Sequence, residues 1–260
     1  MRVKMHGFYE HFPNHKPIAG EAFINCYNDG FCTKGNTDEN SIALLIEPRS
    51  IDPRGYIWIE DHPNHYKYVF THDNELLKLP NARPIYYGGI WSWSDEPKTK
   101  LCSIVSSDKE MCELHRIRKQ LAFDYKGKID TFGTFDGGPK VDTFTSHAAY
   151  KFAVVIENYI DDWWFTEKIC NCFANKVIPL YLGASKIGSL FDTGGIIRFR
   201  NHEQLRRGLD ELLNDPSRAD MIYKSSKASI EENYKRVKKY ENFETWFFNE
   251  YEGLLNGMEI

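Results

Sequence analysis

The chain has 260 residues, of which 42% are hydrophobic and 27% are charged. These values fit a globular protein with one large domain or two small ones. Its 33 basic and 37 acidic side chains give a formal net charge of -4, so the basic excess typical of a nucleic-acid-binding protein is missing. The aromatic content of 15% is high, and aromatic rings supply both core packing and flat faces on which sugars or bases stack.

Neither a leader nor a membrane span is predicted. The opening MRVKMHGFYEHF has no apolar run long enough for a signal peptide. No window of the sequence approaches the roughly 20 apolar residues of a membrane helix. We therefore expect a cytoplasmic protein, or a soluble piece of a longer one. None of the six cysteines has the CxxC spacing of a zinc or redox motif, so we expect reduced, packing thiols.

Strand patterns dominate the first part of the chain. Residues 2–9 alternate and are rich in strand formers. Residues 41–48, SIALLIEP, are a short apolar run that predicts a buried parallel strand with Glu47 at its carboxyl end. Residues 66–73 repeat this pattern and bring His72 to the strand exit.

After a further strand at residues 100–107, the pattern becomes helical. Met111, Leu114, Ile117 and Leu121 lie three or four residues apart, which predicts a helix over residues 108–125. The same reasoning predicts, in order, strands at 128–135 and 150–158, a helix at 165–176, strands at 177–184 and 194–199, and helices at 202–214, 217–239 and 243–256.

Strands that alternate with helices favour βαβ units and parallel sheets. We expect an α/β fold of two Rossmann-like lobes whose parallel sheets face a central cleft. The first lobe would span residues 1–107 and the second residues 108–242, and the helix in residues 243–260 would pack back on the first lobe. Ligands of open α/β sheets bind at the carboxyl ends of the strands. The residues predicted at these ends are Glu47, His72, Ser107, Asn158 and Gly183.

Residues 150–184 are the most informative stretch. They predict a strand that ends at Asn158, a polar loop, a helix that opens with Thr166, Glu167 and Lys168, and a second strand. A helix N-terminus offers unpaired N–H groups and a positive dipole end, which suit a phosphate. Lysine is unfavourable in a first helical turn, and an anionic ligand would remove that conflict. The alternative is that Lys168 points to solvent.

This stretch resembles the signature of glycosyltransferase family 10, the α-1,3/1,4-fucosyltransferases. The residues that match its YKF, EN, TEK and P-x-x-x-G elements are Tyr150, Lys151, Phe152, Glu157, Asn158, Thr166, Glu167, Lys168, Pro179 and Gly183. Two positions depart from the family pattern. Tyr159 replaces the usual serine, and Trp164 replaces the usual tyrosine.

The resemblance implies a GT-B-like fold and an inverting transfer of fucose from GDP-fucose to a hydroxyl of a glycan acceptor, with no obligatory metal or other cofactor. It implies that the donor is bound by residues of the signature: Asn158, Tyr159, Trp164, Glu167, Lys168 and Gly183. Arg116 best matches the arginine that binds the donor diphosphate, with Arg118 as the alternative. The short segment IEPR resembles the acidic position of the first lobe and implies that Glu47 is the general base.

These residue types suit the reaction. A carboxylate can take the proton of the acceptor hydroxyl, and cationic side chains with a helix terminus can stabilise the departing diphosphate. The departures at Tyr159 and Trp164 keep another GDP-deoxysugar open as the donor, and a non-catalytic nucleotide-sugar-binding module is a further alternative. Asp161 and Asp162 could form a metal site, but adjacent acids without a spacer favour a solvated loop.

Overall fold

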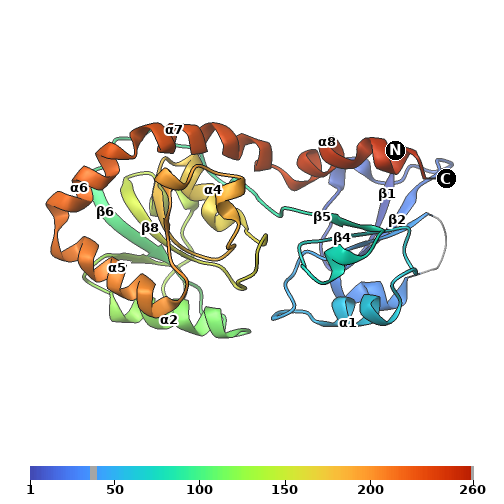
Figure 1. The fold of residues 1–260 in the computed structure, drawn as a ribbon, viewed down its shortest axis with the longest axis horizontal. Helices are drawn as coiled ribbons and strands as arrows, with labels where there is room; N and C mark the ends of the chain where they lie inside the picture. Colours follow the sequence, from blue (N-terminus) through green and yellow to red (C-terminus); the bar gives the residue numbers. More distant parts are fainter. Residues whose placement is uncertain (36–39, 259–260) are drawn as a thin grey trace. The chain divides into compact units, whose positions relative to one another are not determined.

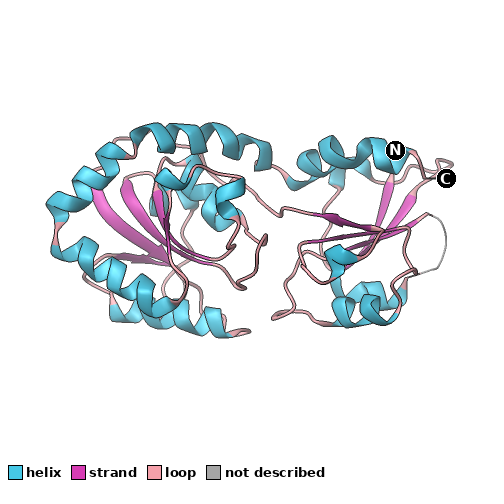
Figure 2. Cartoon of the chain, viewed as in Figure 1, coloured by secondary structure: helices cyan, strands magenta, loops and turns pink. Residues whose placement is uncertain are grey.

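The computed structural model describes residues 1–35 and 40–258. It contains two parallel sheets, each of five strands (Figures 1 and 2). The chain divides into two compact units. The first unit consists of Met1–Tyr87, Asp161–Trp164 and Asn242–Ile260, and the second of Gly88–Ile160 and Phe165–Glu241. The division therefore comes before the boundary expected at residue 107, because the strand at Lys100–Val105 pairs with the second sheet.

All strands of the first sheet are parallel and are neighbours in chain order, β1-β2-β3-β4-β5. Its elements are β1 (Val3–His6), β2 (Ile24–Asn28), β3 (Ser41–Leu44), α1 (Arg54–Asp61), β4 (Tyr68–Thr71), β5 (Ala82–Pro84) and α8 (Phe243–Asn256), with short 3-10 helices at Pro13–His15, Asp29–Lys34 and Leu76–Lys78. Every residue of β3 is buried, as expected for a parallel strand that is covered on both faces.

The two faces of the first sheet are covered by different helices. Val69 of β4 belongs to the buried cluster that contains Tyr56 and Ile59 of α1. The next residue, Phe70, contacts Phe247 of α8, with ring centroids 4.8 Å apart. Successive strand residues point to opposite faces, so α1 and α8 lie on opposite sides of this sheet. The aromatic helix expected at 243–256 is α8, and it packs on the first unit.

Glu244 links α8 to the N-terminal segment of the chain. Its buried carboxylate accepts hydrogen bonds from the backbone N–H and the side-chain amide of Asn14, at 2.8 and 2.6 Å. It also bonds Nδ1 of His15 at 2.7 Å. Asn242 caps the helix by accepting the N–H of Thr245 at 2.9 Å. Polar bonds at one end of α8 and aromatic packing along it therefore fix the helix on the sheet.

The second sheet has the order β10-β9-β8-β6-β7 and is also parallel. Its unit contains β6 (Lys100–Val105), α2 (Glu113–Asp124), β7 (Asp130–Phe132), α3 (Thr143–His147), β8 (Tyr150–Ile156), α4 (Glu167–Ala174), β9 (Ile178–Leu182), β10 (Ile197–Arg198), α5 (His202–Asn214), α6 (Pro216–Ser225) and α7 (Lys227–Arg236), with 3-10 helices at Ile187–Ser189, Thr193–Gly195 and Val237–Tyr240. The helices α2 and α5 cover one face and α4 the other (Figure 1).

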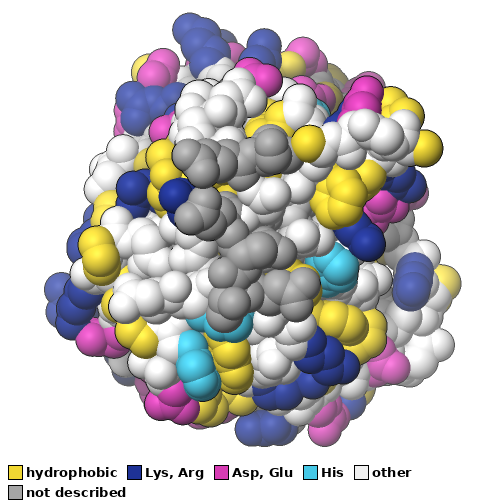
Figure 3. Space-filling model, turned by 90° about the vertical axis from the view of Figure 1, so that its right-hand side faces the viewer, with side chains coloured by type: hydrophobic (Ala, Val, Ile, Leu, Met, Phe, Trp, Pro, Cys, Tyr) yellow, Lys and Arg dark blue, Asp and Glu magenta, His cyan; other side chains and the backbone are white. Residues whose placement is uncertain are grey.

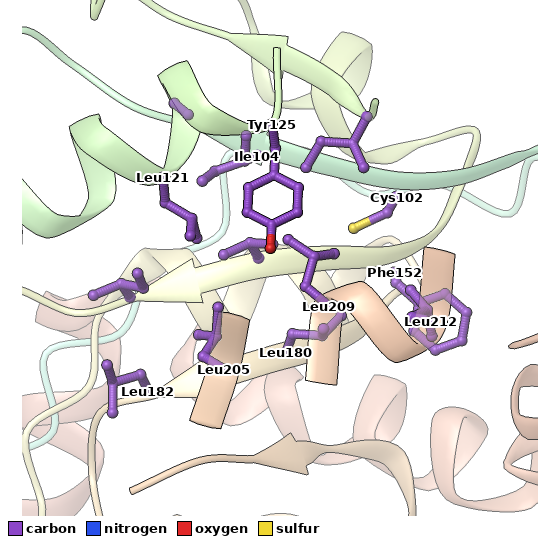
Figure 4. Close-up of a cluster of buried hydrophobic side chains, with 14 of the residues drawn as sticks. Cys102, Ile104, Leu121, Tyr125, Phe152, Leu180, Leu182, Leu205, Leu209 and Leu212 are labelled. Carbon is purple, nitrogen blue, oxygen red and sulfur yellow. The ribbon is translucent and has the colours of Figure 1, made fainter. Parts of the chain in front are cut away.

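The core of the second unit forms where these helices meet the sheet. Figure 4 shows Tyr125 among Leu121, Leu209 and Leu180, which come from α2, α5 and β9. The Tyr125 hydroxyl donates to the Asp210 carboxylate at 2.6 Å, so the one polar atom of this ring is satisfied at the edge of the core. The helix expected over residues 217–239 is instead split into α6 and α7 at Ser226. There the neighbouring Ser225 hydroxyl donates to the Ile222 carbonyl at 3.0 Å, a side-chain bond that competes with helical pairing.

The cysteines agree with the expectation from the sequence, and charged side chains of both signs reach the surface. On the face in Figure 3, outside the grey residues, both dark-blue Lys and Arg and magenta Asp and Glu side chains are exposed. All six cysteines are buried free thiols. None of the helices formed by residues 1–35 and 40–258 combines the length and the apolar character that a bilayer crossing needs.

We expect Glu244→Ala to lower the free energy of unfolding by about 3 kcal/mol, because it removes a buried carboxylate that bonds the backbone and side chain of Asn14 and the ring of His15. Urea unfolding at neutral pH would measure the loss. Glu252→Ala is the matched control, since Glu252 is an exposed glutamate of the same helix, and it should change stability by less than about 0.5 kcal/mol. Equal effects of the two substitutions would contradict the linking role of Glu244.

Candidate functional site in the second unit and its counterpart in the first

The order of the second sheet marks its ligand-binding position. The chain runs from β6 to β7 on one side and then to β8 on the other side of β6. In open α/β sheets, ligands bind outside the carboxyl ends of the strands at such a switch point. The residues that follow β8 are Glu157 and Asn158, and α4 begins after the loop that they start. The signature stretch therefore lies where this fold binds ligands.

Glu157 organises this end of the sheet. The seven residues of β8 are almost wholly buried, and Glu157 follows them with 0% exposure. Its carboxylate accepts the backbone N–H of Thr166 at 3.0 Å and the Thr166 hydroxyl at 2.8 Å. Burial raises the pKa of Glu157, and the nearby Lys168 opposes that rise. The carboxylate thus fixes the residue that caps α4.

Lys168 turns back toward the strand and away from bulk solvent. Its ammonium group lies 2.9 Å from the Thr166 hydroxyl, 3.2 Å from Glu167 Oε1 and 3.5 Å from Glu157 Oε2. Its side chain is 24% exposed, so the alternative of a solvated lysine does not hold. Burial opposes the charge of Lys168, but Glu167 and Glu157 outweigh it and raise its pKa.

Glu167 remains ionised beside this lysine. Burial would raise the pKa of Glu167, yet the charge of Lys168 and hydrogen bonds from Lys168 and Thr166 lower it overall. Its side chain is partly exposed. The first turn of α4 therefore presents one cation and one anion, both held in place, at the carboxyl end of β8.

Arg118, and not Arg116, joins this cluster. Arg118 is 6% exposed, and its Nη1 donates to the Ile156 carbonyl at 2.5 Å and to Asn158 Oδ1 at 3.2 Å. Arg116 lies on the exposed side of α2 and donates to the Glu110 carbonyl at 3.2 Å. The structure thus places Arg118, the alternative, beside the signature residues and Arg116 on the exposed side of α2.

The helical spacing contained a signal for this choice. Arg118 lies four residues after Leu114 and three before Leu121, which places it on the apolar face of the predicted helix. His115 lies three residues before Arg118 and shares that face; it is 4% exposed, and its Nδ1 has no hydrogen-bond partner. Burial, together with Arg118 and Lys168, lowers the pKa of His115 to about 4. Sequence reasoning missed this residue.

The remaining expected donor residues of the second unit are Asn158, Tyr159 and Gly183. Asn158 is half-buried and accepts a hydrogen bond from Arg118. Tyr159 is half-buried on the loop that follows it. Gly183 is buried at the exit of β9, where an added Cβ would lie 2.4 Å from the Tyr181 hydroxyl and 2.7 Å from Glu157 Cγ. Only glycine fits this close approach, so Gly183 makes room for the Glu157 side chain.

In the first unit, Glu47 follows β3 but does not belong to it. The strand expected at 41–48 ends at Leu44. The N–H of Leu45 still donates to the Phe70 carbonyl of β4 at 2.8 Å. The N–H groups of Ile46 and Glu47 donate instead to Asp29 Oδ1, at 2.7 and 3.0 Å. Asp29 is buried with a φ of 46°, a region that few non-glycine residues adopt. Burial raises the pKa of Asp29 to about 7, although the two backbone bonds oppose the rise.

Trp164 belongs to the first unit, whereas Glu167 and Lys168 belong to the second. Its indole N–H donates to the Ile46 carbonyl at 3.0 Å, and its side chain is buried. Asp161, which was expected in a solvated loop, bonds His72 Nδ1 through Oδ2 at 2.7 Å. Its Oδ1 accepts the N–H groups of Trp163 and Trp164 at 2.8 and 2.5 Å. This part of the loop is therefore anchored by polar bonds.

The described residues contain no group of three or more His, Cys, Asp or Glu side chains arranged to hold a metal ion. Two other acids of the first unit are engaged with a cation. Arg49 bonds Asp73 through Nε at 2.6 Å and through Nη2 at 3.1 Å, and its Nη2 bonds Glu60 at 2.6 Å. These contacts and the cation of Arg49 hold the pKa of Asp73 below its ordinary value, although burial opposes them.

Comparisons with known proteins agree with this geometry. Two crystal structures of α1,3-fucosyltransferase share the fold. One, with GDP, has a TM-score of 0.52 at 12% identity and covers 84% of this chain and 81% of its own. The other has a TM-score of 0.50 at 11% identity and covers 91% and 82%. A search of the curated proteins found no match.

The family "Glycosyltransferase family 10 (fucosyltransferase) C-term" matches residues 95–247. This range is more than half of the chain, and it contains the whole signature with Glu157, Thr166, Glu167 and Lys168. The chain therefore belongs to glycosyltransferase family 10, the fucosyltransferases.

Proposed function

We propose that this protein transfers fucose from GDP-fucose to a hydroxyl group of a glycan acceptor, with inversion at the anomeric carbon. The observation that carries the proposal is the cluster of Lys168, Glu167 and Arg118 at the carboxyl end of β8. Family membership supports the reaction class, and a structure of the same fold is described with GDP. Incubation with GDP-fucose and candidate glycans, with release of GDP as the readout, tests the proposal.

The donor diphosphate would bind at Lys168, Arg118 and the N-terminal turn of α4. Cations and a helix N-terminus stabilise negative charge that grows on a leaving group. Lys168 is held only by acceptors that a phosphate oxygen can replace, namely the Thr166 hydroxyl and two carboxylates. Arg118 is fixed by Asn158 and by the Ile156 carbonyl, so its remaining guanidinium donors are preorganised.

Glu167 suits the sugar part of the nucleotide. A partly exposed, ionised carboxylate accepts hydrogen bonds from vicinal hydroxyl groups, and Lys168 keeps Glu167 ionised. Asn158 and Gly183 act on the site through other residues in this proposal. Asn158 orients Arg118, and Gly183 leaves space for Glu157. Tyr159 lies on the adjoining loop and stays a candidate contact of the donor.

Glu47 is the proposed general base that takes the proton of the acceptor hydroxyl. Two observations support it over the neighbouring acids. Asp73 and Glu60 are both bonded to Arg49, and the Arg49 cation helps to hold the pKa of Asp73 below its ordinary value although burial opposes this. The backbone of Glu47 is held by a contact with Asp29, which fixes the position from which its side chain extends. A positioned carboxylate of this kind can accept a proton during attack of the hydroxyl on the anomeric carbon.

The alternative donor, another GDP-deoxysugar, is less favoured than it was on sequence alone. It was motivated by the departures at Trp164 and Tyr159. Trp164 packs in the first unit and bonds the Ile46 carbonyl, so its identity is explained by anchoring of the loop. A binding module without turnover would release no GDP in the assay above, and the family match does not favour it.

Lys168→Ala should weaken GDP binding by about 1.5–3 kcal/mol, because it removes a charge-assisted bond to the diphosphate. Isothermal titration calorimetry would measure this change. Arg118→Lys should also weaken binding, since lysine lacks the forked donors of arginine. Arg116→Ala is the matched control on the exposed side of α2 and should leave affinity unchanged. If Arg116→Ala weakened GDP binding and Lys168→Ala left it unchanged, the diphosphate would not bind at Lys168 and the start of α4.

Glu47→Gln keeps the size of the side chain and removes its basicity. We expect a rate loss on the order of 10²–10⁴, the usual contribution of general base catalysis. GDP affinity should stay at the wild-type value, because the proposed donor contacts are elsewhere. Steady-state kinetics with calorimetry would separate the two effects. Turnover near the wild-type rate would exclude Glu47 as the base.

Turnover should survive EDTA, because Lys168, Arg118 and the α4 N-terminus already offset the charge of the leaving diphosphate. The assay compares initial rates before and after exhaustive chelation. Loss of activity that added manganese restores would require a metal-dependent mechanism.

A further inference from the structure

The polar groups around Glu47 include several that the proposed donor site does not use. Asp29 accepts the N–H of Glu47 at 3.0 Å. The carbonyl of Glu47 accepts a hydrogen bond from the Tyr56 hydroxyl at 2.7 Å. Side chains from two other segments therefore hold both polar groups of this residue's backbone, and neither bond belongs to a strand or a helix.

Tyr56 is the first member of a buried chain of hydrogen bonds. Its hydroxyl lies 2.9 Å from Nε2 of His72. The other ring nitrogen, Nδ1, lies 2.7 Å from Asp161 Oδ2. Tyr56 and His72 are buried, with exposures of 0% and 1%. The chain thus runs from the Glu47 carbonyl through α1 and the exit of β4 to the loop of the family signature.

Each member of this chain has partners on both sides. A carbonyl can only accept, so the Tyr56 hydroxyl donates to Glu47. One ring nitrogen of His72 contacts Tyr56 and the other contacts Asp161. Asp161 Oδ1 in turn accepts the backbone N–H groups of Trp163 and Trp164, so the chain ends on fixed backbone donors.

The signature loop also holds the residue before Glu47. The Trp164 indole N–H donates to the Ile46 carbonyl at 3.0 Å. Asp161 orders that tryptophan by accepting its backbone N–H at 2.5 Å. Asp161 therefore reaches the segment of Glu47 by two routes, one through His72 and Tyr56 and one through Trp164. Packing alone would not require this polar arrangement, because burying ionisable groups costs free energy that an apolar side chain avoids.

We propose that Tyr56, His72 and Asp161 form a positioning relay that fixes the backbone of Glu47 and thereby orients its carboxylate for catalysis. The inference rests on the proposed role of Glu47 as the general base. None of the three is assigned contact with substrate; they act through Glu47. The relay makes the loop of the signature necessary for the geometry of the base as well as for the entry into α4.

Tyr56→Phe tests the relay with the loss of a single hydroxyl. We expect kcat to fall by about tenfold, the factor that corresponds to one hydrogen bond. The KM for the donor and the affinity for GDP should stay unchanged. Tyr66→Phe is the matched control: its hydroxyl is also buried in the first unit and donates to a backbone carbonyl, that of Cys32, at 2.5 Å. It should cost similar stability and leave kcat at the wild-type value.

The double variant Glu47→Gln with Tyr56→Phe separates positioning from general damage to the structure. If Tyr56 acts through Glu47, adding Tyr56→Phe to Glu47→Gln should lower kcat little further. Equal kcat for Tyr56→Phe and Tyr66→Phe, or full additivity in the double variant, would overturn the relay. A fully active Glu47→Gln would show that Glu47 is not the base. An impaired Glu47→Gln together with a fully active Tyr56→Phe would instead leave Glu47 as the base and exclude only the relay.

Discussion

A buried carboxylate at the end of β8 sets the conditions for the rest of the second unit's site. Glu157 has no exposed surface, and a carboxylate in that environment needs several donors close by. Thr166 supplies two of them and Lys168 contributes its charge. To do so, the chain must return to the strand end and start α4 there. The position of the helix N-terminus, the inward turn of Lys168 and the absence of a side chain at Gly183 all follow from satisfying Glu157.

The first unit meets a similar constraint in a different way. β3 ends early because Asp29 takes the N–H groups of Ile46 and Glu47 that would otherwise continue the sheet. The positive φ of Asp29 stores strain, which persists only where the surroundings fix it. At the second sheet, the side chain of Glu157 is anchored by the backbone N–H and the hydroxyl of Thr166. At the first sheet, the backbone of Glu47 is anchored by the side chains of Asp29 and Tyr56. Either arrangement produces a polar residue whose direction is set before a ligand arrives, which is the condition for electrostatic preorganisation.

Much of this fold was predictable because apolar periodicity is a local property. The strand at β8, the helix at α5 and the aromatic helix α8 followed from their patterns. β2 and α1 were missed, since INCYN mixes buried polar and apolar residues and α1 is only eight residues long. The motif identified Glu167 and Lys168 correctly as neighbours in the first turn of α4. The contacts of Asp29, Tyr56 and His115 depend on which segments meet in three dimensions, and no local pattern of the sequence carries that information.

The pairing of Lys168 bears on the proposed donor site. Its ammonium group has three oxygen partners within 3.5 Å, so a diphosphate that bound there would exchange with them. Such an exchange would yield less free energy than a new charge pair, because Glu157 and Glu167 would lose part of their compensation. A departing GDP carries one more negative charge than the diphosphate of the intact GDP-sugar, so it would compete better for the same ammonium. In the proposed site, this pairing would weaken ground-state binding more than it weakens the transition state, which is the difference that accelerates a reaction.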